Sequence, residues 1–238
     1  MTEIKISKKV QQENDIFNNA IDYLTEIYGD FERVVEQQDR PDAAIKLKSS
    51  DYTIGIEITT VDSERELEYF NDRKHSVNDR AEDIERCLRG EIPENPFKKL
   101  AMDRPKHSLF EALNKKTSKF KEYKKNGNFN ELIILTFSDY IGVDESYFKP
   151  FLVPWTYYLL SRSDFPYTKV IFVSRETKEC VLLYDKKRKM NMPPRLNQDI
   201  TTTHIQTKML PVGKTINLYD MFKGEPEVKP KSKKRKRK

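Results

Sequence analysis

Apolar residues near the start of the chain follow the spacing of one face of an α-helix. Between residues 16 and 35 they stand at Phe17, Ala20, Ile21, Leu24, Ile27, Tyr28, Phe31, Val34 and Val35. A helix brings positions three and four residues apart onto the same side, and polar residues fill the positions between them. The pattern therefore predicts an amphipathic helix over residues 16–35.

Two short segments after this helix alternate between apolar and polar residues instead. They are "DAAIKLK" at 42–48 and "TIGIEIT" at 53–59, and the polar stretch "SSDY" at 49–52 separates them. Alternation is typical of β-strands, and a short polar break between two such runs is typical of a turn. The sequence therefore predicts a β-hairpin over residues 42–59.

The rest of the chain mixes further helices and strands. Residues 62–90 are highly charged with few apolar anchors, which predicts solvated helices that end at the prolines of "EIPENPF". Helical spacing returns over 107–125 and around 144–162. Three more strands are expected: "ELIILTF" at 131–137, "KVIFVSR" at 169–175 and "CVLLYD" at 180–185. This order predicts a mixed α/β fold with one central sheet flanked by helices.

Charge is distributed unevenly along the chain. The formal net charge is +6, but residues 229–238, "KPKSKKRKRK", contain eight Lys or Arg and no acid. Subtracting these eight charges leaves −2 for residues 1–228. Because such a run buries no apolar surface, we expect residues 225–238 to be a disordered basic tail that attracts polyanions. A solubilising end or an import-like signal is the alternative interpretation. Residues 1–224 are expected to form a single domain.

Cysteine usage and hydropathy indicate the compartment. Cys87 and Cys180 are far apart, and neither belongs to a CxxC motif, which favours a reducing environment and argues against structural zinc. The first residues contain no apolar signal core, and the apolar run at 151–160 is too short to span a bilayer. We therefore expect a soluble, cytoplasmic protein.

Two carboxylates stand out on the predicted hairpin. Ile54, Ile56 and Ile58 share one face of their strand, so Glu57 points to the other face. On the preceding strand Asp42 has the same orientation, which allows the two carboxylates to approach each other. Like charges brought together repel unless a cation lies between them, and a hard ion with oxygen ligands, such as Mg²⁺, suits that position.

The segments "RPDAAI" and "IGIEIT" resemble the core of the PD-(D/E)XK, or restriction-endonuclease-like, superfamily. The resemblance depends on Pro41, Asp42 and Glu57 and on the helix before them. It implies a restriction-endonuclease-like core, nuclease activity, and Asp42 and Glu57 as ligands of a catalytic Mg²⁺ or Mn²⁺ ion. One position departs from the family pattern, because the lysine expected two residues after the glutamate is Thr59 in this chain.

The helix predicted over 107–125 offers a replacement for that lysine. Its apolar stripe comprises Leu109, Ala112, Leu113, Phe120 and Tyr123. Lys116 stands where the next inward residue of the stripe should be, and Lys119 follows one turn later. Some branches of the superfamily carry the lysine on a neighbouring helix, and this arrangement is similar. We therefore expect Lys116, and after it Lys119, to point toward Asp42 and Glu57.

Each of these residues also has a purely structural interpretation. Asp42 suits the start of a strand after a turn, and Glu57 suits the solvent side of a half-exposed sheet. The lysines of 107–125 suit a solvated helix face. Other catalytic classes lack support, since the glycines form no phosphate-binding loop and three scattered histidines provide no base for a hydrolase triad.

The function expected from the sequence is a metal-dependent nuclease that acts on DNA, with the basic tail assisting binding. A homodimer would suit cleavage of both strands of a duplex. Two alternatives remain open. Because of Thr59, the chain is alternatively an inactive nuclease-like domain that binds nucleic acid or a protein partner. It is otherwise a protein-interaction module tethered by its tail.

Overall fold

A computed structural model describes residues 8–34, 37, 40–70, 77–92, 97–207, 212–215 and 217. Contacts divide the chain into two compact units. Residues 1–224, expected to be one domain, are shared between these units, and the expected basic tail at 225–238 lies outside the described residues. The first unit comprises Met1–Asp62 and Pro105–Gln198, and the second comprises Ser63–Arg104 and Asp199–Lys238.

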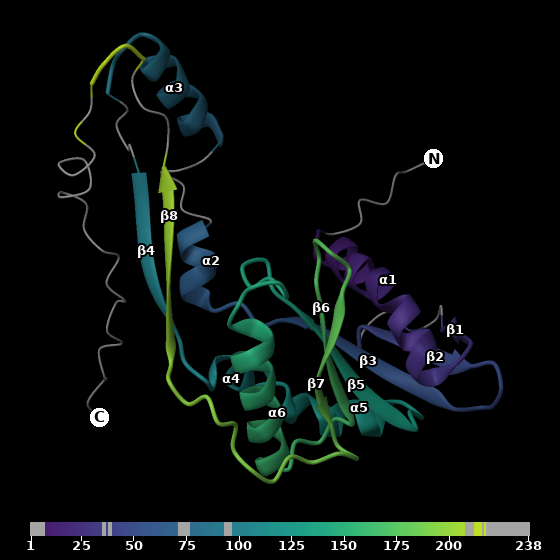
Figure 1. Cartoon of the computed structure of the whole chain (residues 1–238). Coiled ribbons are helices and arrows are strands. Elements are labelled where there is room, and N and C mark those ends of the chain that lie inside the picture. The colour runs from purple at the N-terminus through teal and green to yellow at the C-terminus, as the bar shows by residue number, and fades with distance from the viewer. Residues whose placement is uncertain are drawn as a thin grey trace, which may run out of the picture. The chain divides into compact units, whose positions relative to one another are not determined.

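A six-stranded sheet forms the centre of the first unit (Figure 1). β3 and β5 run parallel to each other, as do β5 and β6, whereas the remaining neighbours are antiparallel. The predicted mixed α/β fold class is therefore confirmed. In spatial order the strands are β1 (Phe31–Arg33), β2 (Ala43–Leu47), β3 (Thr53–Thr60), β5 (Glu131–Phe137), β6 (Lys169–Val173) and β7 (Cys180–Asp185).

One face of this sheet is covered by α1 (Lys8–Tyr28), whose apolar side buries Ile16, Phe17, Ala20 and Leu24. These side chains pack against the three isoleucines of β3 and against apolar residues of β2, β5 and β6. The predicted helix over 16–35 is wrong beyond Tyr28. Gly29 adopts a φ of 79° and its N–H bonds to the carbonyl of Thr25 at 2.8 Å, which ends the helix. Phe31 then begins a strand.

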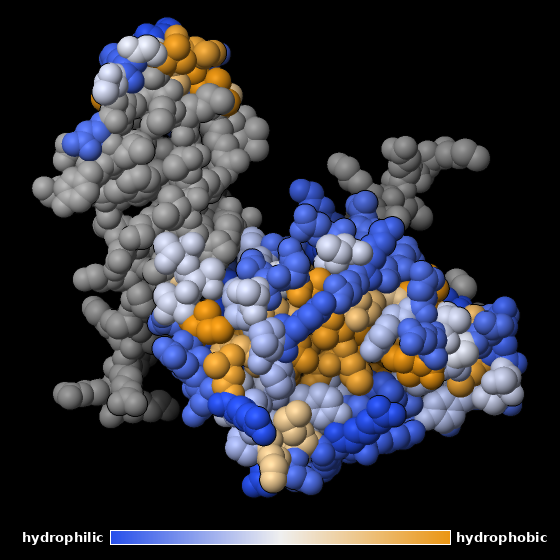
Figure 2. All heavy atoms as spheres, viewed as in Figure 1, coloured by the Kyte–Doolittle hydropathy of each residue, from blue (hydrophilic) through white to orange (hydrophobic). Residues whose placement is uncertain are grey.

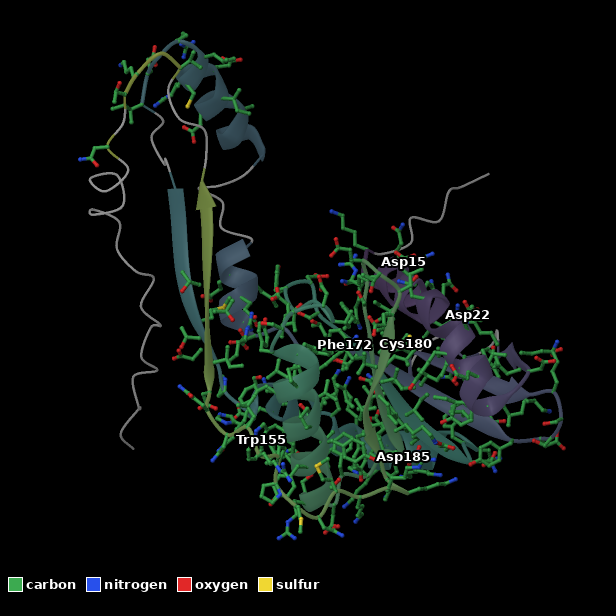
Figure 3. The ribbon with its side chains drawn as sticks, in the orientation of Figure 1. Asp15, Asp22, Trp155, Phe172, Cys180 and Asp185 are labelled. Carbon is green, nitrogen blue, oxygen red and sulfur yellow. The ribbon has the colours of Figure 1, made fainter. Side chains whose placement is uncertain are left out.

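Helices cover the opposite face: α4 (Ser108–Asn114), α5 (Thr117–Asn126), a π-helical turn η2 (Phe148–Leu152) and α6 (Val153–Arg162). Phe148 of η2 contacts Phe172 of β6, and Tyr157 of α6 contacts Tyr184 of β7. Figure 3 shows Trp155 on α6, and Asp15 and Asp22 on α1. In Figure 2, apolar residues show over the middle of this unit between hydrophilic ones.

The single helix predicted over 107–125 is instead two helices that meet at Lys115 and Lys116. The N–H of Lys116 still bonds to the carbonyl of Leu113, at 2.9 Å, so the turn is tightened at this point. The hydroxyl of Tyr167 donates to the Lys116 carbonyl at 3.2 Å. The backbone at the junction is thus anchored to the body of the unit.

The second unit contains two long antiparallel strands, β4 (Phe97–Arg104) and β8 (Ile200–Thr207), with α2 (Glu64–Phe70) and α3 (Val77–Leu88). Arg104 and Glu66 form a buried ion pair. The sequence pattern missed both strands, because "FKKLAMDR" and "ITTTHIQT" lack the regular alternation of a half-buried strand. The predicted helical character of residues 62–90 is confirmed for α2 and α3.

Gly55 permits close packing where the hairpin meets β5. A methyl group added at Gly55 would lie 2.6 Å from Cδ2 of Leu132 and 3.0 Å from both Phe129 and Pro41. Replacing Gly55 with Ala should therefore lower the free energy of unfolding by about 1–3 kcal/mol, as measured by chemical denaturation. In a Leu132→Ala background the same change should cost less, since its closest neighbour is gone. Equal costs in both backgrounds would contradict this account.

Candidate active site

Asp42 is fixed to the strand that carries Glu57. It lies directly before β2, and its Oδ2 accepts a hydrogen bond from the backbone N–H of Ile58 at 2.7 Å. Among the described residues none donates a hydrogen bond to its second oxygen, Oδ1. The carboxylate is therefore held beside β3, one residue beyond Glu57, with one oxygen still available to a ligand.

Glu57 lies in the middle of β3 and is only 1% exposed. The ammonium of Lys116 donates to its Oε1 at 2.9 Å, and the hydroxyl of Tyr123 donates to its Oε2 at 2.6 Å. Lys119 Nζ lies 3.6 Å from Oε1. The alternative interpretation, in which Glu57 faces solvent on a half-exposed sheet, is wrong, because α5 and the α4–α5 junction cover that face.

Lys116, the first choice from the sequence, and Lys119, the second, both direct their ammonium groups to the carboxylate of Glu57. Lys116 occupies the junction between α4 and α5, and Lys119 follows in the first turn of α5. The side chain of Lys116 is 22% exposed and that of Lys119 is 49% exposed. Lys116 is therefore the more enclosed cation and the one in hydrogen-bonding contact with Glu57.

Thr59 does not supply the positive charge that the resemblance places at this strand position. It lines the same cavity as the carboxylates, but its side chain makes only a long, 3.4 Å contact with the carbonyl of Thr60. Its own carbonyl accepts a hydrogen bond from the hydroxyl of Thr136 at 2.8 Å. The positive charge at this site comes from the helices and not from β3.

Sequence reasoning missed three residues at this site. Tyr123 belonged to the apolar stripe of its helix and was counted as core, yet its hydroxyl holds Glu57. Glu13 and Lys9 on α1 line the cavity and lie 3.3 Å apart. They fall outside the predicted helix, which began at residue 16, so the pattern gave no reason to orient them toward Asp42.

The two carboxylates have their pKa values moved in opposite directions. Burial raises the pKa of Asp42 to about 7, and the negative charge of Glu57 acts in the same direction. Burial alone would also raise the pKa of Glu57, but the hydrogen bonds from Lys116 and Tyr123 outweigh it and leave that pKa below its ordinary value. Glu57 is thus ionised at neutral pH while Asp42 is partly protonated.

A cavity of about 210 Å³ gives solvent access to these groups. It is open enough for water and a phosphate group, and both acids and lysines face into it. Its lining comprises Lys9, Gln12, Glu13, Asp42, Glu57, Ile58, Thr59, Thr60, Lys116, Lys119 and Phe137.

The donor set suits a hard divalent cation. Mg²⁺ is commonly bound through one or two carboxylates, with water and phosphate oxygens as its other ligands. In the part of the chain that the structure describes, no group of three or more His, Cys, Asp or Glu could hold a metal ion. An ion held by Asp42 and Glu57 would therefore take its remaining ligands from solvent or substrate.

Known proteins provide no relative with which to compare this site. No protein-family model, no curated protein and no solved structure matches the chain. Among the described residues, no helix is long and apolar enough to cross a membrane.

The raised pKa of Asp42 predicts a pH-dependent stability. Its pKa is about 7 in the folded chain and 3.8 when unperturbed. Between these values Asp42 binds more protons in the folded chain than in the unfolded chain, so its contribution to the free energy of unfolding should fall as pH rises from 3.8 to about 7 and then level off. Asp42→Asn should remove this contribution to the slope.

Denaturant titrations in EDTA at several pH values would measure the effect. As pH rises through this window, the free energy of unfolding of the variant should increase relative to that of the wild type. Mg²⁺ added above pH 7 should stabilise the wild type and not the variant. If the two proteins have parallel pH profiles, the surroundings of Asp42 do not raise its pKa.

Proposed function

We propose that this chain is a metal-dependent nuclease with a restriction-endonuclease-like core, which hydrolyses phosphodiester bonds in DNA. The observation that carries the proposal is the convergence of Asp42, Glu57 and Lys116 on one cavity. They come from three separate segments of the chain. A lysine that belonged only to a solvated helix face would point to water and not to a buried glutamate.

The fold around the cavity supports the proposal. The motif residues lie on an antiparallel hairpin, β2–β3, with α1 before it. Two helices then precede β5, which joins the sheet parallel to β3. This is the order of elements that the resemblance implies, with the second unit's residues 63–104 inserted between β3 and α4.

In the proposed reaction a water molecule attacks phosphorus, and the P–O bond to the leaving alcohol breaks. Asp42 and Glu57 would hold Mg²⁺ or Mn²⁺, which when bound activates the water and neutralises phosphate charge. The ammonium of Lys116 supplies a fixed positive charge and N–H donors where negative charge develops on the phosphate oxygens. Tyr123 is a positioning residue, because its hydroxyl holds Oε2 of Glu57.

The carboxylates provide the first test of this function. Asp42→Asn and Glu57→Gln should each reduce cleavage of plasmid DNA in Mg²⁺ or Mn²⁺ by at least about 100-fold, because both remove a metal ligand. Asp51→Asn is the control, since Asp51 is exposed and pairs only with Lys46. Circular dichroism would verify that the variants fold. Wild-type rates in either site variant would exclude this site assignment.

Lys116 distinguishes an enzyme from an inactive nuclease-like domain. Lys116→Ala should reduce the cleavage rate by about 10²–10³-fold with little change in metal affinity, since the lysine acts on the transition state and is not a ligand. Lys119→Ala should have a smaller effect, because its ammonium is farther from Glu57 and more exposed. Lys121→Ala, an exposed change on the same helix, serves as the control.

A second substitution tests the role of position 59. Thr59→Lys in the Lys116→Ala background should restore part of the rate, because it returns the ammonium to the strand position of the family. If Lys116→Ala cleaves as fast as Lys121→Ala, the lysine is a structural partner of Glu57 only. If the wild type cleaves no nucleic acid with either metal, the chain is not a nuclease.

A further inference from the structure

A second, larger cavity continues the first across Asp42. It has a volume of about 530 Å³ and shares Glu13, Asp42 and Ile58 with the smaller cavity. The two cavities therefore form one groove with the carboxylates near its middle. Lys116 and Lys119 line the first part of this groove, and Arg33 lines the second.

Arg33 is held in place although its side chain is exposed. It ends β1, the edge strand of the sheet, and like Phe31 two residues earlier it points to the side covered by α1. Its guanidinium carbon lies 4.6 Å from the centre of the Phe17 ring, and its Nη2 donates to Oδ1 of Asn14 at 2.7 Å. An arginine has five N–H donors, so others remain available to a ligand.

These contacts preorganise the guanidinium of Arg33 to bind an oxyanion. Stacking and one hydrogen bond reduce the rotamer freedom that binding would cost, and the planar fork of donors matches a phosphate group. No acid among the described residues forms an ion pair with Arg33. In that part of the chain, no carboxylate neutralises its charge.

The groove suits the sugar-phosphate backbone better than the bases. Phe137 is the one aromatic residue among the described residues that line either cavity, and it is only 4% exposed. Proteins that stack bases use exposed aromatic side chains for this purpose. Apart from Val10 and Ile58, the remaining lining residues are charged or polar, and they include Arg33 and three lysines, the residue types that contact phosphates.

We propose that Arg33 binds a phosphate that neighbours the scissile one on the same nucleic-acid strand, whatever its base sequence. This inference rests on the proposed function, which places the scissile phosphate beside Lys116. The strand would pass over Asp42 from the lysines to the arginine. Glu13 between them is partly compensated by Lys9, 3.3 Å away.

Equilibrium binding tests the subsite without any cleavage. Fluorescence anisotropy in EDTA would compare wild type, Arg33→Ala, Arg33→Gln and Arg162→Ala on two short DNA duplexes of unrelated sequence. Arg162 is a matched control, because it is an exposed arginine at the end of α6 that lines neither cavity. Thermal melts would identify any variant that fails to fold, and Arg33→Gln keeps hydrogen-bonding capacity if the alanine variant is unstable.

Both Arg33 variants should bind about tenfold more weakly at low salt, and equally so on the two sequences. The slope of log affinity against log salt should fall by about one, because one phosphate contact is lost. Arg162→Ala should match the wild type. Affinities and slopes for Arg33→Gln equal to those of Arg162→Ala would overturn the proposal, as would a loss confined to one sequence.

A separate cleavage assay keeps the two proposals apart. If the wild type binds DNA through Arg33 but does not cut it in Mg²⁺ or Mn²⁺, the proposed nuclease function is wrong and the proposed phosphate subsite is retained. If the wild type cuts DNA and Arg33→Ala cuts with unchanged KM and kcat, the subsite is wrong and the nuclease stands. With both correct, Arg33→Ala should raise KM on DNA, because the contact with the neighbouring phosphate is lost.

Discussion

The structure around the site depends on a charge buried in the middle of a sheet. Glu57 lies in the middle of β3 on the face opposite its isoleucines and is buried there, where an ionised carboxylate without partners would cost several kcal/mol, on the order of the penalty for one desolvated ion. Lys116 and Tyr123 each donate to one of its oxygens and offset that cost. Removing either donor would take away part of this compensation and raise the pKa of Glu57. The positions of α4 and α5 against the sheet are thus tied to the same contacts that define the site.

Much of the sheet could be predicted because its strands are simple in pattern. The alternation in 42–48 and 53–59 and the unbroken apolar run of β5 agree with β2, β3 and β5. Lys116 was placed correctly because it interrupts an apolar stripe, although the helix assumed for that stripe is broken at the same residue. The break depends on tertiary contacts, among them the hydroxyl of Tyr167 on the Lys116 carbonyl. No local pattern contains that information.

The parts that escaped prediction have physical reasons in common. Tyr123 has an apolar ring and a polar hydroxyl group. The spacing of apolar residues indicates where the ring is buried but not what the hydroxyl binds. β4 and β8 pair across about a hundred intervening residues, and neither has an apolar face regular enough to indicate a strand. The roles of Glu13 and Arg33 depend on where α1 and the edge strand meet, which is a property of packing. Sequence patterns thus indicate local elements and miss what depends on contacts between distant segments.

The hydrogen bond from Ile58 to Asp42 also has a consequence for solubility. β2 pairs with β3 only as far as Ile56, so the last residues of β3 extend past their neighbour on that side. An N–H exposed there would invite a strand from another molecule to add to the sheet, which is a common route to aggregation. The Asp42 carboxylate accepts the hydrogen bond from the N–H of Ile58, so this donor is not available to another strand. Asp42, which we propose as a metal ligand, therefore also protects this end of the sheet from pairing with strands of other molecules.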